Sequence, residues 1–444
     1  MSAPPTAAAA RRAYLVVLAL RWLPTGLMVP IFVLLMTGRG LSLAEVGVAA
    51  AAQGVAIVVF ELPTGGLADA IGRRPVLVLS SLVATAGLAL LLVADDVTTF
   101  ALAWAVMGVY RALDSGPLEA WFVDAALAAE PDRRLEHDLT RAGVVLGLSL
   151  AVGAVAGGAL GAAVAGRDGV AATEPLTAMV AAALVLEVVH LVAVLILVRE
   201  RRPARGLGAA VRAARATPTV VRAALDVMRR DRGLLALLGV EVLWGVGLTG
   251  IERFWQPRAA ELLDGAVDDL FVLGLLGAAG WLAHAGGAAL LPPLLRLVGG
   301  RTEWAAALLR ILQGAAVLGL ALVGGFTGLV IAYVAVYVAH GASNPAHEAL
   351  LHRRVAAAER ATVLSANSLV SQGSGALGGI ALGVLAGAAG IPVTWAVTAA
   401  ILAAAAPLYL VRGTPRAARI SLPTDSDRRP TAPAGVTAGP GEQQ

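Results

Sequence analysis

The sequence of 444 residues contains no cysteine and no lysine. Without cysteine, disulfide bonds and thiolate metal sites are excluded. All 34 basic residues are therefore arginine, which together with the abundant alanine and glycine indicates genomic base composition and not a chemical requirement. Charge is scarce as well, because Asp, Glu and Arg make up only 14% of the chain, against roughly a quarter in soluble globular proteins. This scarcity argues against a soluble domain.

Long apolar runs occupy most of the chain. Hydrophobic residues make up 58% of it, and the mean hydropathy is +0.79. The runs are continuous and do not alternate, so they predict helices and not the strands of a membrane barrel. We expect an all-α membrane protein with twelve transmembrane helices at 13–36, 43–65, 75–94, 98–123, 141–165, 175–198, 233–257, 269–295, 304–324, 327–350, 363–389 and 392–411.

The arginines orient these helices in the membrane. With a cytoplasmic N-terminus, 27 of the 34 lie in inner loops and tails and four lie inside spans, which leaves only Arg39, Arg167 and Arg258 in outer loops. This asymmetry follows the positive-inside rule. It predicts a multi-pass protein of the plasma (cytoplasmic) membrane with both termini cytoplasmic. Because topology accounts for the arginines, the pI near 10 does not indicate a nucleic-acid partner.

The two halves of the chain look like repeats. Glu119-Ala120 ends the fourth span as Glu348-Ala349 ends the tenth. Duplicated six-helix bundles around a midplane cavity are typical of transporters. We predict a six-helix bundle at 1–198, a basic cytoplasmic linker with an amphipathic helix at 199–232, a second, pseudo-symmetric six-helix bundle at 233–412 and a disordered cytoplasmic tail at 413–444. For the linker, a simple tether is favoured over a regulatory site.

The connection between the second and third spans is the most informative segment. It reads Gly65-Gly66-Leu67-Ala68-Asp69-Ala70-Ile71-Gly72-Arg73-Arg74. Glycines let the helix ends approach closely, and the acid can face helix termini and arginines. The segment resembles the loop signature of the major facilitator superfamily, G-x-L-a-D-r-x-G-r-r, with Ala70 where a basic residue is usual. The resemblance implies a carrier that works by alternating access, whose halves are latched on the cytoplasmic side by Gly65, Asp69, Gly72, Arg73 and Arg74.

Polar side chains inside the membrane are costly, so each is a functional candidate. The fourth span carries Arg111, Asp114 three residues later and Glu119. Arg111 and Asp114 are close enough to pair, either for proton exchange or substrate binding, or merely to neutralise each other. The segment resembles the R-x-x-q-G pattern of superfamily antiporters, which implies an influence of Arg111 on proton transfer, although Gly116 comes one residue late and the glutamine is absent.

Other spans carry further candidates for the substrate or proton pathway, which are Arg21, Glu187, His190, Glu241, Glu252, His340, Asn344, His347 and Glu348. Glu241 and Glu252 are eleven residues apart and share a helix face, so they are either stations of a proton path or, for Glu252, a residue of the outer interface. His347 and His352 are five apart and do not share a face as zinc-protease histidines do. We expect no metal, no cofactor and no catalytic constellation, and therefore no enzyme.

The fifth span is rich in glycine. Its segment Gly153-Ala154-Val155-Ala156-Gly157-Gly158 lets helix backbones approach, with Gly153, Gly157 and Gly158 as packing positions. It resembles the antiporter signature G-P-x-x-G-G, with Ala154 in place of proline, and this resemblance implies an exporter. The ninth span matches R-x-x-q-G literally at Arg310-Ile-Leu-Gln313-Gly314, but on the wrong helix, so we interpret that match as coincidence.

These observations predict a secondary active transporter, with proton-coupled efflux of small hydrophobic or cationic compounds as the leading hypothesis because several acids are buried. Its partners would be a small-molecule substrate, protons and the lipid bilayer, and we expect a monomer. Two alternatives stay open. One is uptake of a sugar or organic acid, or lipid translocation, by the same fold. The other is a membrane scaffold or sensor that does not transport.

Overall fold

The computed structural model describes residues 6–65, 67–171, 173–200, 231–263, 269–355 and 360–411, together with the isolated positions 208, 222 and 229. Within these ranges every regular element is a helix. The predicted linker helix and the C-terminal tail lie outside them. The all-helical membrane fold expected from the continuous apolar runs is confirmed.

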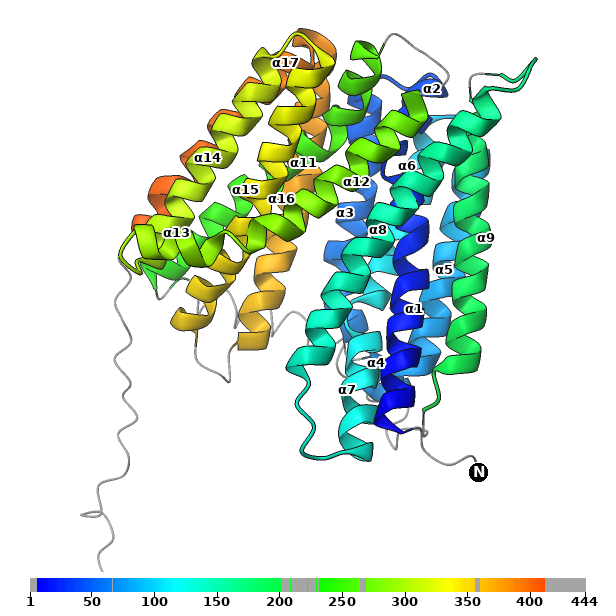
Figure 1. Cartoon of the computed structure of the whole chain (residues 1–444), viewed down its shortest axis with the longest axis vertical. Coiled ribbons are helices and arrows are strands. Elements are labelled where there is room, and N and C mark those ends of the chain that lie inside the picture. Colours follow the sequence, from blue (N-terminus) through cyan, green and yellow to red (C-terminus); the bar gives the residue numbers. More distant parts are fainter. Residues whose placement is uncertain are drawn as a thin grey trace, which may run out of the picture. The chain divides into compact units, whose positions relative to one another are not determined.

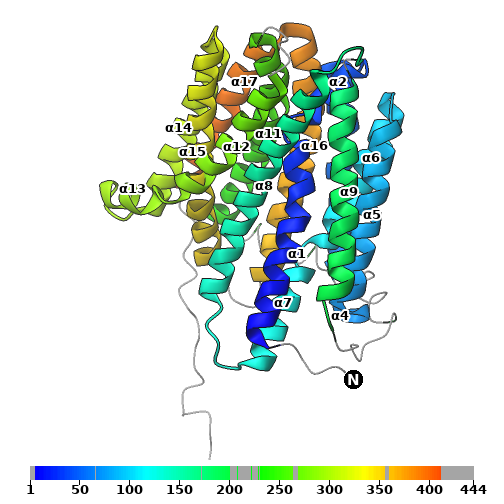
Figure 2. The same cartoon turned by 45° about the vertical axis from the view of Figure 1, so that its right-hand side comes forward.

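The first set of helices, which we call the N-half, contains the six predicted N-terminal spans. Its elements are α1 (Ala7–Met28), α2 (Phe32–Gly38), α3 (Leu43–Gly65), α4 (Leu67–Ile71), α5 (Arg73–Val93), α6 (Val97–Asp114), α7 (Pro117–Ala129), α8 (Glu136–Ala165) and α9 (Glu174–Leu197). Figures 1 and 2 show α4 and α7 at the end of the helices where the chain begins. We call this end the inner end, following the arginine distribution, and the opposite end the outer end.

The second set, the C-half, follows the same plan. Its elements are α11 (Arg232–Leu262), α12 (Asp269–Ala288), α13 (Leu291–Leu297), α14 (Thr302–Leu322), α15 (Phe326–Arg354), α16 (Arg360–Ala389), α17 (Ile391–Ala404) and the 3₁₀ helix η1 (Ala406–Leu410). The span predicted at 269–295 is shorter than expected, because α12 ends at Ala288 and the two prolines that follow belong to the separate helix α13.

Ten of the described helices are long and apolar enough to cross a membrane, or eleven if the bent pair α1 and α2 forms one span. The predicted span that this criterion omits is the fourth. There α6 carries Arg111 and Asp114, and the helix breaks before α7 because Ser115 is extended and Gly116 is left-handed, with φ of 97°. Glycine adopts this conformation without the steric cost that other residues pay.

Local chemistry sets where α6 begins. The carboxylate of Asp96 accepts hydrogen bonds from the backbone N–H groups of Thr98, at 2.7 Å, and Thr99, at 2.9 Å. The Thr99 hydroxyl in turn accepts from the Asp96 backbone, which completes a capping box. The hydrogen bond from Thr99, with a further one from Thr98, lowers the pKa of Asp96 below its usual range. The boundary is therefore encoded in adjacent residues.

Each half has an apolar cluster at both ends and a polar layer between them. In the N-half, one cluster contains Phe100 at the outer end and the other contains Phe122 at the inner end. In the C-half the corresponding clusters contain Trp395 and Tyr409. Several buried charged side chains, among them Arg21, Asp114 and Glu187 in the N-half and Glu241 and Arg310 in the C-half, belong to neither apolar cluster of their half. This layering places the candidate site near the middle of the helices.

The two halves meet through α3 with α16, α8 with α12, and α2 with α11. Glycine makes the outer contacts close. A Cβ on Gly47 would lie 2.6 Å from the carbonyl oxygen of Gly379, and one on Gly383 would lie 2.6 Å from that of Leu43. In Figure 1, α8 crosses α12 in the upper part of the picture, toward the outer end. The outer ends of the halves are therefore closed against each other.

Candidate functional site

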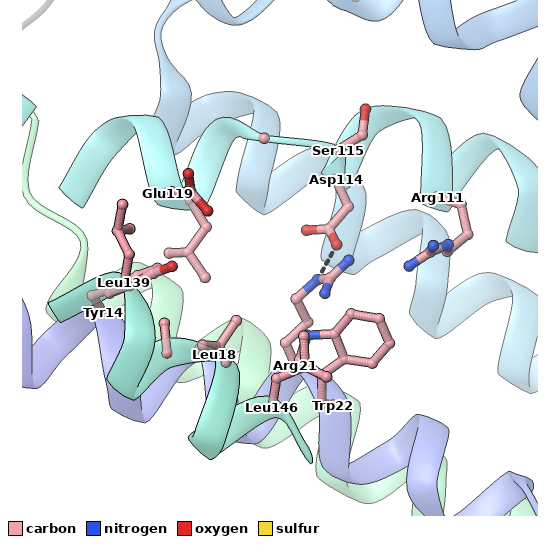
Figure 3. A pocket seen from close by; sticks show the side chains of 14 residues that line it. Tyr14, Leu18, Arg21, Trp22, Arg111, Asp114, Ser115, Glu119, Leu139 and Leu146 are labelled. Atoms are coloured by element: carbon pink, nitrogen blue, oxygen red, sulfur yellow. Dashed lines mark hydrogen bonds and ion pairs between the residues drawn. The ribbon is translucent and has the colours of Figure 1, made fainter. Parts of the chain in front are cut away.

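A buried ion pair joins the first and fourth predicted spans. The guanidinium of Arg21 on α1 contacts the carboxylate of Asp114, the last residue of α6. Both residues are at most 9% exposed, and the guanidinium of Arg21 lies 4.3 Å from the ring centroid of Trp22. The partner of Asp114 is thus Arg21 on another helix. Arg111 lies about one turn before Asp114 on α6, and its guanidinium is 5.5 Å from the ring centroid of Trp22 (Figure 3).

A pocket of about 420 Å³ opens beside this ion pair. It lies between α1, α6, α7 and α8, and Figure 3 shows its side chains. Glu119 on α7 lines it together with Tyr14 on α1, whose ring stacks on Phe122 at 4.6 Å. The structure therefore brings four sequence candidates, Arg21, Arg111, Asp114 and Glu119, to one pocket of the N-half.

An acid–imidazole pair extends the polar layer of the N-half. On α9, the Nδ1 atom of His190 lies 2.9 Å from the carboxylate of Glu187 and 3.2 Å from the hydroxyl of Ser81 on α5. Glu187 and His190 are only 2% and 1% exposed. Glu187 is also near enough to Arg21 and Asp114 for their charges to interact. Glu187 and His190, two of the candidates named from the sequence, thus belong to a network that joins four helices.

The C-half has its own acid–imidazole pair. On α15, the Nε2 atom of His347 lies 3.3 Å from a carboxylate oxygen of Glu241 on α11. Its Nδ1 atom lies 3.0 Å from the hydroxyl of Tyr409 in η1. Sequence analysis named Glu241 and His347 as separate candidates and missed Tyr409, because no local pattern links η1 to α11 and α15.

Sequence analysis also underrated Arg310 and Gln313. Arg310 donates to the side-chain oxygen of Gln313 at 2.8 Å, and both residues are fully buried on α14. Arg310 also interacts electrostatically with Glu241 and lies beside Tyr409. The resemblance of this segment to the antiporter pattern remains on the wrong helix. The signal that should have counted was an arginine within an apolar span.

Three further candidates lie on α15, namely His340, Asn344 and Glu348. His340 stacks on Trp244 with centroids 5.6 Å apart, and its ring centroid lies 4.9 Å from that of His284. Both His340 and His347 interact electrostatically with Arg310. The direct contacts of His340 are with Trp244 and His284, whereas those of His347 are with Glu241 and Tyr409. Asn344 is half-buried and Glu348 is exposed. Their position on one helix therefore does not give these side chains the same direct contacts.

A second pocket, of about 350 Å³, lies between the two halves, and we call it the central cavity. Aromatic side chains supply much of its wall, namely Phe32, Trp244, Trp255, Trp281 and Tyr337. Glu252 lines the cavity and is exposed to it. Within the described ranges, the Glu252 carboxylate makes no hydrogen bond and no ion pair, although the adjacent Arg253 interacts with it electrostatically. The central cavity thus combines an accessible acid with aromatic surface.

Nearer the inner end, a side-chain contact joins the two halves. The hydroxyl of Ser368 on α16 donates to the carboxylate of Glu61 on α3 at 3.0 Å. Glu61 was not among the candidates predicted from the sequence, and it lies four residues before the loop that resembles the superfamily signature. An acid inside an apolar run was again the available signal.

The loop resembling the superfamily signature lies at the inner end. Gly65 is the last residue of α3, and the side chain of Asp69 is outside the described part of the chain. Gly72, with φ of 100°, precedes α5. The backbone N–H groups of Arg73 and Arg74 donate to the carboxylate of Glu200 at 3.0 and 2.8 Å, and the Arg73 guanidinium contacts Asp124. Asp124 lies in the N-half and Glu200 follows α9 directly, so none of these described contacts reaches the C-half. The latch between halves stays a prediction.

The glycines of the fifth span lie in close contacts. A Cβ on Gly153 would come within 2.7 Å of the Leu23 carbonyl oxygen on α1, and one on Gly157 within 2.8 Å of that of Leu27. Gly158 faces the other half, where its Cβ would overlap the carbonyl oxygen of Leu270 on α12. This segment therefore joins α8 to both halves at once.

The fold, the layered core and a cavity between two sets of helices define a polytopic helical membrane protein of the carrier type. A family model described as Major Facilitator Superfamily matches residues 14–339. The chain belongs to this superfamily. A search of curated proteins finds no match.

Solved structures show the same fold. A nucleoside transporter, NupG, is 13% identical with a TM-score of 0.73, and the match covers 90% of this chain and 98% of that one. A bacterial homologue of the human lysosomal transporter Spinster, in an inward-facing and unoccupied conformation, is 15% identical with a TM-score of 0.69, covering 92% and 97%. A structure described for proton-dependent oligopeptide transporters is 14% identical with a TM-score of 0.66, covering 90% and 97%. At these identities the likeness shows the fold alone.

Proposed function

We propose that this protein is a secondary active transporter that works by alternating access and exports small hydrophobic or cationic compounds in exchange for protons. The observation that carries the proposal is Glu252, a carboxylate that lines an aromatic cavity between the halves and that, among the residues the structure describes, forms no hydrogen bond or ion pair. A carboxylate attracts a cation, and aromatic faces bind both cations and apolar groups. A hydrophobic cation matches both properties of the cavity.

Proton exchange is assigned to the two buried acid–imidazole pairs, Glu241 with His347 and Glu187 with His190. The charge of the arginine beside Asp114 is permanent, so that ion pair is a poor site for proton uptake. A carboxylic acid and an imidazole can each take up or release a proton, and an acid beside an imidazole can change charge without leaving an unpaired guanidinium. If such a pair binds a proton more tightly in one orientation of the halves than in the other, protonation shifts the balance toward that orientation.

Flux measurements in proteoliposomes test this proposal. With an organic cation and an imposed pH gradient, the wild-type protein should accumulate the cation against its gradient. Glu241→Gln should abolish gradient-driven accumulation while downhill exchange persists, because the side chain no longer takes up a proton. Glu252→Gln should raise KM for the cation by roughly tenfold or more, the loss of one charge-assisted contact, and should affect a neutral hydrophobic substrate less.

The outcomes separate the two parts of the proposal. Transport that ignores the pH gradient in the wild type and in Glu241→Gln excludes proton exchange. An unchanged KM for the cation in Glu252→Gln excludes the central cavity as the cation site. Conservation of the substrate-free fold in each variant is checked by size-exclusion chromatography, so that loss of protein is not mistaken for loss of function.

A second candidate has an observation of its own. The central cavity also contains the amide side chains of Gln53 and Gln372, and amides with aromatic rings suit a neutral polar molecule. This favours uptake of a sugar or similar polar solute. Accumulation of such a solute by intact cells, without any effect of Glu252→Gln, would select uptake over export. The plasma-membrane location, cytoplasmic termini, monomeric state and loop latch are part of the leading proposal.

A further inference from the structure

A glutamine side chain from the C-half is inserted into a break in the first span of the N-half. The span is bent by 42° between α1 and α2, at Pro30. The side-chain amide of Gln256 on α11 donates to the carbonyl oxygen of Val29 at 2.8 Å, and its oxygen accepts from the backbone N–H of Val33 at 2.9 Å. Gln256 is 3% exposed.

The two groups that Gln256 satisfies are partners in a regular helix. The N–H of residue i donates to the carbonyl of residue i−4, so Val33 would normally donate to Val29. Proline lacks an N–H and its ring clashes with the carbonyl four residues earlier, which here is that of Gly26. Pro30 therefore bends the helix without removing the Val29 or Val33 group. The Gln256 amide takes the place of the missing Val33-to-Val29 hydrogen bond.

The same turn of α11 connects this insertion to the central cavity. Glu252, four residues earlier, lines the cavity, and the guanidinium of Arg253 reaches the backbone oxygen of Gly47 on α3 at 3.5 Å. Gly379 on α16 packs against the same guanidinium. One helical turn thus carries a cavity acid and two side chains that reach the N-half.

We propose that Gln256 is a positioning residue that holds the outer ends of the two halves together. In the other state of the cycle, its two hydrogen bonds are replaced by a direct hydrogen bond from the Val33 N–H to the Val29 carbonyl. When the halves part at the outer end, the amide withdraws. Burial without a partner is costly for a backbone N–H or carbonyl, so the first span straightens and the direct bond forms. The break between α1 and α2 is therefore an element with two states. This inference rests on the proposed alternating-access cycle.

Distances between spin labels test the inference directly. The chain has no cysteine, so Asp168→Cys and Gly324→Cys introduce the only two labels. They lie in outer connections of the N-half and the C-half, and a side chain at Gly324 would meet nothing within 4 Å. We expect Gln256→Leu to raise the ratio of outer-open to outer-closed molecules by roughly tenfold, from the loss of the two inserted hydrogen bonds.

Pro30→Ala supplies the decisive comparison. Without the proline ring, the first span can form the direct Val33-to-Val29 bond more readily, so this variant should also shift toward longer outer distances. Because both substitutions act on the same exchange, the double variant should shift by less than the product of the single effects. Gln53→Leu is the matched control, since it also removes a cavity amide but, among the described residues, no hydrogen bond of that amide. It should leave the outer distances unchanged.

Opposite results would overturn the inference. Wild-type distance distributions in both Gln256→Leu and Pro30→Ala would remove Gln256 from control of the outer end, and independent, multiplicative effects would exclude the exchange. Gln256→Asn, whose amide is too short to reach both groups, repeats the test if the leucine variant does not fold. Failure of the proposed transport cycle is seen separately, as wild-type distances that never respond to substrate or pH.

Discussion

At the scale of single residues, most polar candidates were identifiable but their partners were not. Arg21, Asp114, Glu187 and His190 stand out in the sequence because each interrupts an apolar run. The i+3 spacing on one helix suggested Arg111 as the partner of Asp114, whereas Arg21 on α1 contacts it. Spacing along one helix fixes which residues share a face, but a partner on another helix depends on how the two helices are rotated.

The Arg21–Asp114 ion pair gives a stability prediction. Arg21→Met should leave the Asp114 carboxylate buried without a partner and should lower the unfolding free energy by about 3–5 kcal/mol. Replacing both members, as Arg21→Met with Asp114→Leu, should restore most of that loss, because no buried charge is then left without a partner. The measurement is the apparent melting temperature of purified protein in detergent. A double variant no more stable than Arg21→Met alone would show that the pair does not account for the loss.

At the scale of elements, helix boundaries follow local chemistry and helix contacts follow small residues. The capping box at Asp96, the left-handed Gly116 and Pro30 each end or bend a helix by means visible in the sequence. The sequence did not show which helix each glycine faces. On α8, Gly158 meets α12 of the other half, whereas Gly147, three turns closer to the inner end, meets nothing within 4 Å.

These two glycines of α8 form a matched pair for mutagenesis. Gly158→Ala should force α8 away from Leu270 and cost about 1–3 kcal/mol of overpacking in the outer-closed state, with slower transport. Gly147→Ala should be neutral or stabilise by about 0.5–1 kcal/mol, because alanine favours a helix. Thermal unfolding and substrate flux are measured for both. Equal effects of the two substitutions would mean that helix propensity, and not contact with α12, decides the outcome.

At the scale of the whole molecule, the arginine asymmetry makes a prediction about orientation. An impermeant maleimide should label Asp168→Cys in intact cells, whereas Asp132→Cys should react only after the membrane is permeabilised. Both positions are exposed, in the connections after α8 and α7, and the wild-type chain without cysteine provides the blank. The reverse labelling pattern would place both termini outside and would contradict the positive-inside assignment.

The sequence by itself determined that the chain is a helical membrane protein of the major facilitator superfamily, where its spans lie and which polar residues are exceptional. Hydropathy, proline, glycine and arginine bias act locally, so a linear reading captures them. Only the tertiary structure decided that Asp114 meets Arg21, that Glu241 meets His347 and that Gln256 enters the break at Pro30. Each of these contacts joins helices distant in sequence, and it depends on the rotation and depth at which those helices pack.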